Sequence, residues 1–338
     1  MNWIITGGCG FLGTALIRDL MQEDVHTVRV VDNMTVGNRE DLAGACRFTE
    51  IPKAAVAPLS SNIGESSVQL IAGDILDEEL AMKAVEGADV IVHFAANTGV
   101  APSVADPRWD CKTNVLGTFN YLEAARQQGV GRFVFASTGA PLVGEVEPPV
   151  HEEMPVHPVP PYGASKLAGE GYSSAYFRTF GLQTVALRFG NVYGPGSTHK
   201  GSAVAKFTKR AMSGEVLEIY GDGSQTRDFI YIEDLIRAVR LAATVEGVGG
   251  ETFQIATNAE TSVQELIDML LPVLAAAGIK DVEVREIEPR QGDVQRNYSD
   301  TSKADRLLGW RTKVSLDEGL QRTVEWFTEN PESSNRLD

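Results

Sequence analysis

The hydrophobic positions in the first half of the chain alternate between two periods. Short apolar runs, typical of strands buried on both faces, occupy residues 2–6, 26–32, 68–72, 89–94, 132–136 and 183–188. Apolar residues recur every three or four positions, the spacing of helices, over residues 11–22, 77–86, 104–128 and 162–180. Strands that alternate with helices predict an α/β fold, a doubly wound parallel sheet covered by helices on both faces.

Two segments interrupt this alternation. Residues 50–67 follow neither period and are predicted to form a surface loop, and residues 141–161 hold seven prolines and predict a second loop. After about residue 190 the pattern is irregular, with helices expected at 202–213, 233–243 and 262–276. We therefore predict a sheet domain over residues 1–190, to which residues 228–258 return. Residues 191–227 and 259–338 are predicted to form a smaller, interleaved substrate lobe.

Composition and charge narrow the class of protein. Apolar residues make up 43% of the 338 positions, as in ordinary globular proteins, and 30 basic against 46 acidic residues give a net charge of −16. Such an excess of acid argues against a nucleic-acid partner or a membrane surface held by charge. No apolar run reaches the ~18 residues of a membrane span. Cys9, Cys46 and Cys111 are far apart, so we expect no disulfide framework, no metal site and a cytoplasmic location.

A glycine-rich segment lies between the first predicted strand and the first predicted helix. Gly7, Gly8, Gly10 and Gly13 allow both Gly-x-Gly-x-x-Gly and Gly-x-x-Gly-x-x-Gly spacings. At a first strand-to-helix turn, glycines let the backbone approach a pyrophosphate at the helix N-terminus. The segment therefore predicts dinucleotide binding, although a tight turn of an unrelated α/β fold has the same spacing.

Two acidic residues follow the next strands. Asp32 ends the second strand about 20 residues beyond the glycines, where an acid binds the ribose hydroxyls and repels a 2′-phosphate. NAD is therefore favoured over NADP. Asp74 comes directly after the third strand, where its carboxylate can accept a hydrogen bond from an adenine amino group. Solvated acids at strand ends are the alternative interpretation of both residues.

A Tyr-x-x-x-Lys pattern, Tyr162 and Lys166, begins the helix predicted at 162–180. Four residues apart on a helix, the phenol and the ammonium share one face. A phenol with a pKa of ~10 is a poor base at neutral pH unless nearby positive charge stabilises the phenolate. Ser137 and Thr138 end the preceding strand, where a hydroxyl can hydrogen-bond a reacting oxygen. A surface pair and ordinary turn chemistry remain the alternatives.

Taken in this order, the motifs resemble the extended short-chain dehydrogenase/reductase family, specifically its NAD-dependent nucleotide-sugar epimerases and dehydratases, which have a Rossmann sheet. The resemblance covers essentially the whole chain. The matching segments are Thr6–Gly13, Gly73–Ile75, His93–Ala96, Asn114–Thr118, Tyr162–Lys166, Leu187–Pro195, Gly221–Gly223, Arg227–Asp234 and Leu308–Trp310.

The resemblance implies catalytic, cofactor-binding and substrate-binding roles for individual residues. Tyr162 is the base, Lys166 its electrostatic partner and Thr138 the hydroxyl that shares the sugar oxygen. The implied NAD-binding residues are Gly7, Gly10, Phe11, Leu12, Gly13, Asp32, Asn33, Asp74, Ile75, Ala95, Ala96, Asn114, Ser137, Tyr162 and Lys166. The implied UDP-sugar-binding residues are Ser103, Thr138, Tyr162, Asn191, Lys200, Val204, Arg227 and Arg290. The helices predicted at 104–128 and 162–180 resemble the pair that forms the homodimer interface in this family.

Departures from the family pattern indicate the reaction. Dehydratases of the family place Asp-Glu after the Ser-Thr pair, and decarboxylases place a Glu there, whereas this chain has Gly139 and Ala140. Neutral residues at these positions favour a 4-epimerase, although the loop that follows lacks the family's tyrosine. The alternatives are a decarboxylase or 4,6-dehydratase of the same fold, and an inactive NAD-binding sensor or scaffold.

The sugar is predicted from one loop. His199 and Lys200 place cationic capacity in the segment 196–201, which favours UDP-glucuronate and UDP-galacturonate as the substrate pair. The alternative is UDP-glucose and UDP-galactose, or their N-acetyl forms, in which case Lys200 is a solvated charge.

Overall fold

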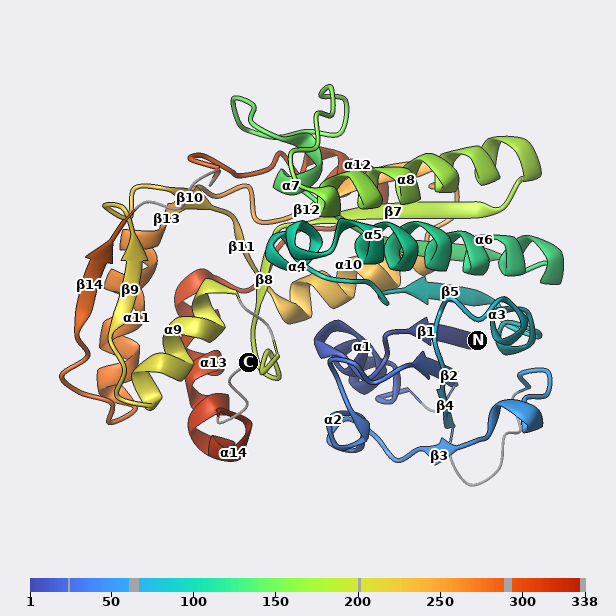
Figure 1. Cartoon of the computed structure of the whole chain (residues 1–338), viewed down its shortest axis with the longest axis horizontal. Coiled ribbons are helices and arrows are strands. Elements are labelled where there is room, and N and C mark those ends of the chain that lie inside the picture. The colour runs from blue at the N-terminus through green and yellow to red at the C-terminus, as the bar shows by residue number, and fades with distance from the viewer. Residues whose placement is uncertain (24, 61–66, 200–201, 289–293, 335–338) are drawn as a thin grey trace.

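The computed structural model describes residues 1–23, 25–60, 67–199, 202–288 and 294–334. Within them, eight parallel strands form one sheet in the order β12-β7-β6-β5-β1-β2-β4-β3 (Figure 1). The strands are β1 (Asn2–Thr6), β2 (Thr27–Asp32), β3 (Thr49–Glu50), β4 (Val68–Ala72), β5 (Val90–His93), β6 (Arg132–Thr138), β7 (Gln183–Phe189) and β12 (Glu251–Ile255). The strand order reverses between β1 and β5, as in a doubly wound sheet, so the predicted fold class is confirmed.

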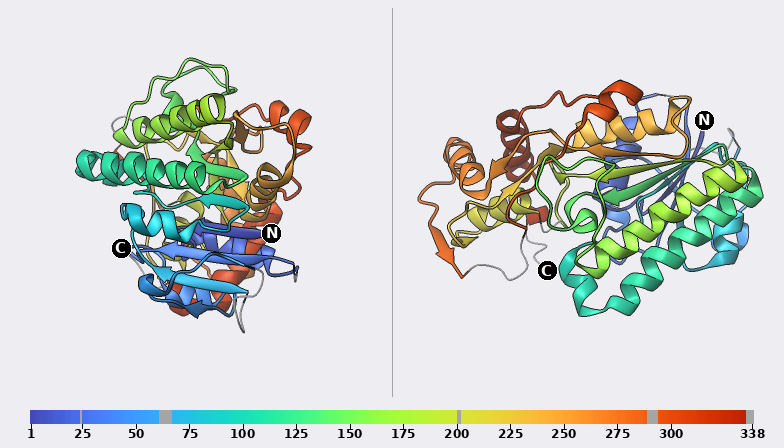
Figure 2. Two further views of the ribbon diagram at one scale, coloured as in Figure 1. Left: turned by 90° about the vertical axis from the view of Figure 1, so that its right-hand side faces the viewer. Right: turned by 90° about the horizontal axis from the view of Figure 1, so that it is seen from above.

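Helices cover both faces of the sheet, as Figure 2 shows from two sides. On one face lie α1 (Phe11–Leu20) and α10 (Ile232–Thr244), and on the other α3 (Glu78–Ala84), α6 (Gly117–Gln128) and α8 (Pro161–Phe180). Adjacent residues of β1 contribute to the hydrophobic cores on opposite faces of the sheet, because side chains alternate along a strand. Trp3 and Ile5 join the core on the α1 side, whereas Ile4 joins the core on the α6 side.

The C-terminal half adds a second group of elements beside the sheet (Figure 1). Their apolar side chains, among them Val204, Leu266 and Leu320, are continuous with the core on the α1 side of the sheet. The domain boundaries given above stay a prediction. The elements are β8 (Asn191–Tyr193) paired with β11 (Phe229–Tyr231), β9 (Leu217–Tyr220) with β14 (Val284–Ile287), β10 (Thr226–Arg227) with β13 (Thr261–Ser262), and the helices α9 (Ala203–Met212), α11 (Val263–Ala276), α13 (Leu316–Glu329) and α14 (Pro331–Ser334). The helix α12 (Ser302–Leu308) instead contacts β12 and α10.

The single helix predicted at 104–128 is wrong. The chain instead forms α4 (Val100–Ala105), α5 (Pro107–Cys111), a π-helical segment (Lys112–Leu116) and α6. Pro107 causes the first break, because the residue before a proline avoids the helical conformation and Asp106 has φ −139°. The Asp106 side chain then caps α5 by accepting a hydrogen bond from the Trp109 N–H at 2.9 Å.

The two predicted loops also contain short elements. β3 and a 3₁₀ turn at Lys53–Ala55 lie at the start of the 50–67 segment, and α7 (Ala140–Val143) lies at the start of the proline-rich one. The short helix α2 (Arg39–Ala43), begun by a capping box on Asn38, has too few residues to produce a visible period. Over the part of the chain that the structure describes, no helix is long and apolar enough to cross a membrane.

Candidate active site

The predicted cofactor and catalytic residues gather at one edge of the sheet. Every strand of the sheet runs in the same direction, so the carboxyl ends of β1, β2, β4, β5 and β6 lie along one edge. The glycine segment follows β1, and the Ser-Thr pair ends β6. This edge spans the reversal of strand order between β1 and β5, where doubly wound sheets bind their ligands.

The glycine segment leaves no room for side chains. Gly7 has φ +70°, and a Cβ atom there would lie 2.8 Å from the backbone nitrogen of Ala95. A Cβ on Gly13 would lie 2.4 Å from the Gly8 Cα, because the start of α1 packs directly on the preceding turn. Gly10, the N-cap of α1, puts no side chain in front of the helix. The segment therefore fits a pyrophosphate, held by backbone N–H groups at the positive end of the helix.

Asp32 links the end of β2 to the glycine segment. Its carboxylate accepts hydrogen bonds from the N–H groups of Cys9 (2.9 Å) and Met34 (2.8 Å). Burial raises the pKa of Asp32, and these two hydrogen bonds oppose the rise. Beside it, the Asn33 amide donates to the Asp74 carboxylate at 3.0 Å. The two positions assigned to ribose and the one assigned to adenine thus form one connected group.

His93 supports the backbone next to this group. Its ring lies between the hydroxyls of Thr6 (2.9 Å from Nδ1) and Thr118 (3.1 Å from Nε2), and burial lowers its pKa to about 3. The imidazole is therefore neutral at physiological pH. The Thr6 hydroxyl also accepts a hydrogen bond from the Ala95 N–H at 3.3 Å, which fixes the backbone that carries Ala95 and Ala96.

Tyr162, Lys166 and Thr138, the three residues predicted to be catalytic, lie together in the structure. Thr138, at the end of β6, hydrogen-bonds the Tyr162 side chain on the first turn of α8. The buried Lys166 donates to the carbonyl of Ala136 at 2.8 Å, and its ammonium lies 5.9 Å from the centre of the Tyr162 ring. The helical spacing places the phenol and the ammonium together, and the packing of α8 against β6 adds the Thr138 hydroxyl.

Burial acts on the ionisation of both residues. It raises the pKa of Tyr162, and the negative charge of Asp110 raises it further, whereas the hydrogen bond with Thr138 lowers it. Burial lowers the pKa of Lys166 to about 8, while Asp110 and Glu170 act in the opposite direction. Because a lysine is charged below its pKa, Lys166 is still mainly an ammonium ion at neutral pH. An ammonium ion at this position favours ionisation of the Tyr162 phenol; its catalytic role stays a prediction.

A buried ion pair that the sequence did not predict lies behind this group. Glu170, one turn after Lys166 on α8, pairs with both Nε (2.9 Å) and Nη2 (2.8 Å) of Arg188 on β7. Ser137 donates to the same carboxylate at 2.5 Å. Ser137, implied to bind NAD, is thus held by Glu170 in this structure. No local pattern in the sequence indicates this pair, because Glu170 and Arg188 belong to different elements.

Asn114 lies in the π-helical segment between α5 and α6. Its side-chain oxygen accepts the Asn97 N–H at 2.7 Å, and its Nδ2 lies 3.0 Å from each of the Ser165 hydroxyl and an Asp110 carboxylate oxygen. The π-helical turn widens the helix by one residue, a distortion that recurs at functional sites. Asn114 therefore joins the start of α8 to the segment after β5. Its implied contact with NAD stays a prediction.

The implied substrate residues occupy both the sheet edge and the second group of elements. Ser103 is buried on α4 and donates to the Val100 carbonyl at 2.7 Å, and Val204 is buried on α9. Asn191 begins β8, and the half-buried Arg227 on β10 donates to the carbonyls of Thr226 and Val294. Lys200 and Arg290 lie outside the described residues. The substrate roles of all six stay predictions.

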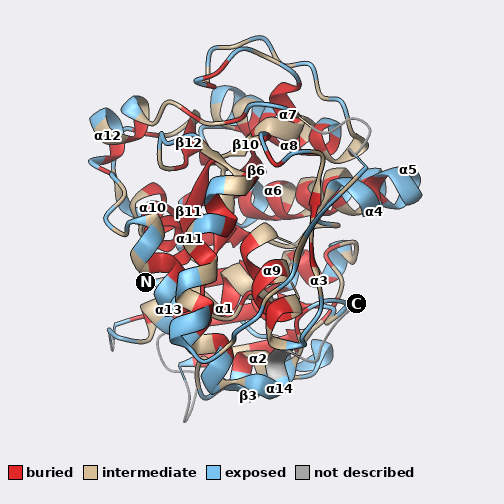
Figure 3. Ribbon diagram, turned by 90° about the vertical axis from the view of Figure 1, so that its left-hand side faces the viewer, coloured by how far each residue is buried: buried red, intermediate tan, exposed pale blue. Residues whose placement is uncertain are grey.

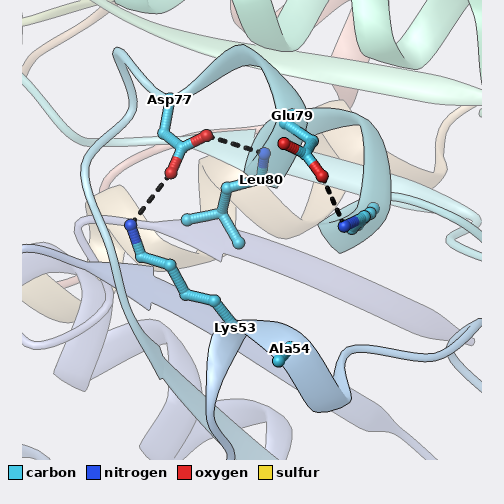
Figure 4. A pocket seen from close by; sticks show the side chains of 6 residues that line it. Lys53, Ala54, Asp77, Glu79 and Leu80 are labelled. Carbon is cyan, nitrogen blue, oxygen red and sulfur yellow. Dashed lines mark hydrogen bonds and ion pairs between the residues drawn. The ribbon is translucent and has the colours of Figure 1, made fainter.

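A surface hollow lies apart from the catalytic group, between the 3₁₀ turn and α3 (Figure 4). Its two lysines each pair with a carboxylate, Lys53 with Asp77 at 2.9 Å and Lys83 with Glu79 at 2.6 Å. Each charge in these pairs is thus matched locally, and we assign no ligand to the hollow.

Comparison with known proteins assigns the family. The model of the NAD dependent epimerase/dehydratase family matches residues 3–256. The chain belongs to this family. The family resemblance and the NAD cofactor predicted from the sequence are thereby confirmed.

Relatives of known function are matched over nearly their full length. A UDP-glucose 4-epimerase of Mycolicibacterium smegmatis is 35% identical over 97% of this chain and 98% of its own. The solved UDP-glucose 4-epimerase of Thermotoga maritima with UDP-glucose is 35% identical, with a TM-score of 0.85 and coverage of 98% and 100%. The Bacillus cereus UDP-glucuronic acid 4-epimerase, solved with UDP-glucuronic acid and NAD, is 28% identical, with the same TM-score and coverage. At the level of these relatives, the prediction of an NAD-dependent isomerase is confirmed.

Proposed function

We propose that this member of the NAD-dependent epimerase/dehydratase family inverts C4 of a UDP-linked sugar, with UDP-glucose and UDP-galactose as its substrate pair. The observation that carries the proposal is the proximity of Thr138, Tyr162 and Lys166. Thr138 ends β6 and is followed in the chain by Gly139 and Ala140. The first three residues supply a base for the sugar 4-hydroxyl. The last two offer no carboxyl group for elimination or for decarboxylation chemistry.

The residues act in a simple order. Tyr162, as the phenolate, takes the proton of the sugar 4-hydroxyl, while Thr138 hydrogen-bonds the same oxygen. NAD, which the glycine segment and Asp32 would hold, would supply the hydride acceptor and donor for C4. Between the two transfers the 4-keto sugar turns about its diphosphate linkage, and Tyr162 then gives its proton back to the 4-oxygen. Lys166 stays protonated throughout and stabilises the phenolate.

The identity of the sugar is argued from the relatives. The uronate preference depends on Lys200, which lies outside the described residues. The two UDP-glucose 4-epimerases compared above are each 35% identical to this chain, whereas UDP-glucuronate 4-epimerases are 28% and 30% identical. We therefore place the neutral hexose first. UDP-glucuronate is retained as the second candidate because of the cationic segment 196–201.

Incubation of the purified protein with each UDP-sugar, without added NAD, tests the proposal. We expect UDP-galactose to form from UDP-glucose, with kcat/KM for the neutral sugar at least about tenfold above that for UDP-glucuronate, a difference of 1.4 kcal/mol. Separation of the two epimers by chromatography measures both reactions. Preferential turnover of UDP-glucuronate would favour the second candidate, and release of carbon dioxide or of a 4-keto-6-deoxy sugar would contradict 4-epimerisation.

The outer surface of α6 and α8 supports a homodimer. The two helices lie side by side along one edge of the molecule (Figure 2). Large apolar side chains are exposed there, Tyr172 and Phe180 on α8 and Leu116 at the end of the π-helical segment that leads into α6. Figure 3 shows the neighbouring helices α4 and α5 exposed as well. Such a surface is typical of an interface. We also propose a cytoplasmic location, with which three free cysteines agree.

Leu116→Arg is expected to convert the dimer to a monomer, because it buries an unpaired charge at the proposed interface. Sedimentation velocity of the full chain measures the change, and Leu307→Arg on α12, also an exposed leucine, serves as the matched control. A wild-type protein that sediments as a monomer, or a Leu116→Arg variant that stays dimeric, would contradict the proposed interface.

A further inference from the structure

Asp110 is fully buried on α5 and belongs to no motif singled out from the sequence. One of its carboxylate oxygens, Oδ1, accepts hydrogen bonds from the side-chain amides of Asn114 (3.0 Å) and Asn97 (3.3 Å). The other, Oδ2, is buried and accepts no hydrogen bond from the described residues. A buried carboxylate with one oxygen that accepts no hydrogen bond lowers the stability of the fold. The presence of Asp110 at this position therefore points to a role other than stability.

The reason lies in what α5 packs against. α5 contacts α8, the helix that carries the catalytic pair, and Asn114 connects Asp110 to the Ser165 hydroxyl between Tyr162 and Lys166. The charge of Asp110 acts on both members of the pair and raises the pKa of each. Glu170 on α8, which is paired with Arg188, also raises the pKa of Lys166. Lys166 in turn lowers the pKa of the neutral His93 on β5.

The two effects of Asp110 have opposite consequences for the reaction. Burial favours the neutral amine of Lys166, and a neutral amine would not stabilise the phenolate; Asp110 counteracts this loss. The same charge makes Tyr162 harder to ionise, so the phenol holds its proton until further positive charge is present. The charge of Asp110 thus favours the ammonium form of Lys166 and disfavours the phenolate form of Tyr162.

We propose that Asp110 is a positioning residue for the Tyr162–Lys166 pair, whose buried carboxylate orients the Asn114 amide and keeps Lys166 an ammonium ion. The inference rests on the proposed function for its catalytic meaning. The effect of Asp110 on the ionisation of Lys166 is measurable without any substrate.

The test compares Asp110→Asn, which keeps the shape and removes the charge, with Asp110→Glu, which keeps the charge. In the NAD-loaded protein, carbon-13 NMR of ε-labelled lysines follows the titration of Lys166, with Lys166→Met identifying its signal. We expect the pKa of Lys166 to fall from about 8 by roughly one further unit in Asp110→Asn and to be restored in Asp110→Glu. Asp106→Asn at the exposed N-cap of α5 is the matched control, since asparagine caps a helix equally well and no shift in the pKa of Lys166 is expected.

The pH profile of kcat provides the second measurement. Loss of the Asp110 charge is expected to move both limbs toward acid by about one pH unit, because Tyr162 ionises and Lys166 deprotonates at lower pH. A lower but unshifted profile, together with an unchanged Lys166 titration, would overturn the inference and leave Asp110 a structural residue. A wild-type protein without epimerase activity contradicts the proposed function instead, while the NMR titration still decides the role of Asp110.

Discussion

Tyr162→Phe is expected to lower kcat by about 100- to 10,000-fold, the contribution of a positioned general base. Phenylalanine keeps the ring that packs near Lys166 and removes only the oxygen that Thr138 hydrogen-bonds. The glycine segment and Asp32 are untouched, so NAD should remain bound. Epimer formation at saturating substrate measures the first effect, and nucleotide released on denaturation measures the second.

The matched control is Tyr172→Phe, which removes a phenolic oxygen from an exposed position on the same helix and should leave kcat unchanged. A Tyr162→Phe variant with more than about a tenth of wild-type kcat would show that another group takes the proton. Loss of both activity and bound NAD would instead assign the tyrosine a role in cofactor binding.

Glu170→Gln is expected to destabilise the fold by about 3–5 kcal/mol, because it leaves the Arg188 guanidinium buried without its counter-charge. The pair is almost entirely excluded from solvent, with side-chain exposures of 5% for Arg188 and 7% for Glu170. Ser137 also loses its charged acceptor. Urea unfolding of the NAD-free protein, followed by circular dichroism, measures the change.

The matched control for this prediction is Glu79→Gln, which breaks the solvent-exposed pair with Lys83 and should cost less than about 1 kcal/mol. A loss below about 1 kcal/mol in Glu170→Gln would contradict the account, since it would mean that the protein re-solvates or repacks around Arg188.

Local patterns sufficed for the parts of the fold that depend on neighbours in sequence. The continuous apolar run at β1 and the helical period of α1 predict a strand and a helix, and the glycines between them predict a close backbone approach to a ligand. Tyr162 and Lys166 are likewise four residues apart on one helix, so their spacing alone places them on one face.

Tertiary packing decided the rest. Glu170 and Arg188 face each other because α8 returns along the sheet to β7, a register that neither residue's own segment encodes. The π-helical turn that carries Asn114 arises among residues with ordinary helical composition. The contact between Asp110 and Asn114 could be predicted in part, because the two residues are four positions apart. The burial of Asp110 could not, because it depends on the packing of α5 against α8. Pro107 itself marks the break before α5, because the residue before a proline avoids the helical conformation.

The central claim, that C4 of a UDP-sugar is oxidised and reduced within one site without release of NAD, is tested most directly with substrate that carries deuterium at C4. UDP-[4-deuterio]glucose is incubated with the protein as purified, without added NAD, in ordinary water. The account predicts UDP-galactose that retains the deuterium at C4, because the hydride leaves and returns at the same carbon. An epimer that has lost its C4 deuterium to solvent would contradict it, as would inversion that requires a stoichiometric supply of NAD.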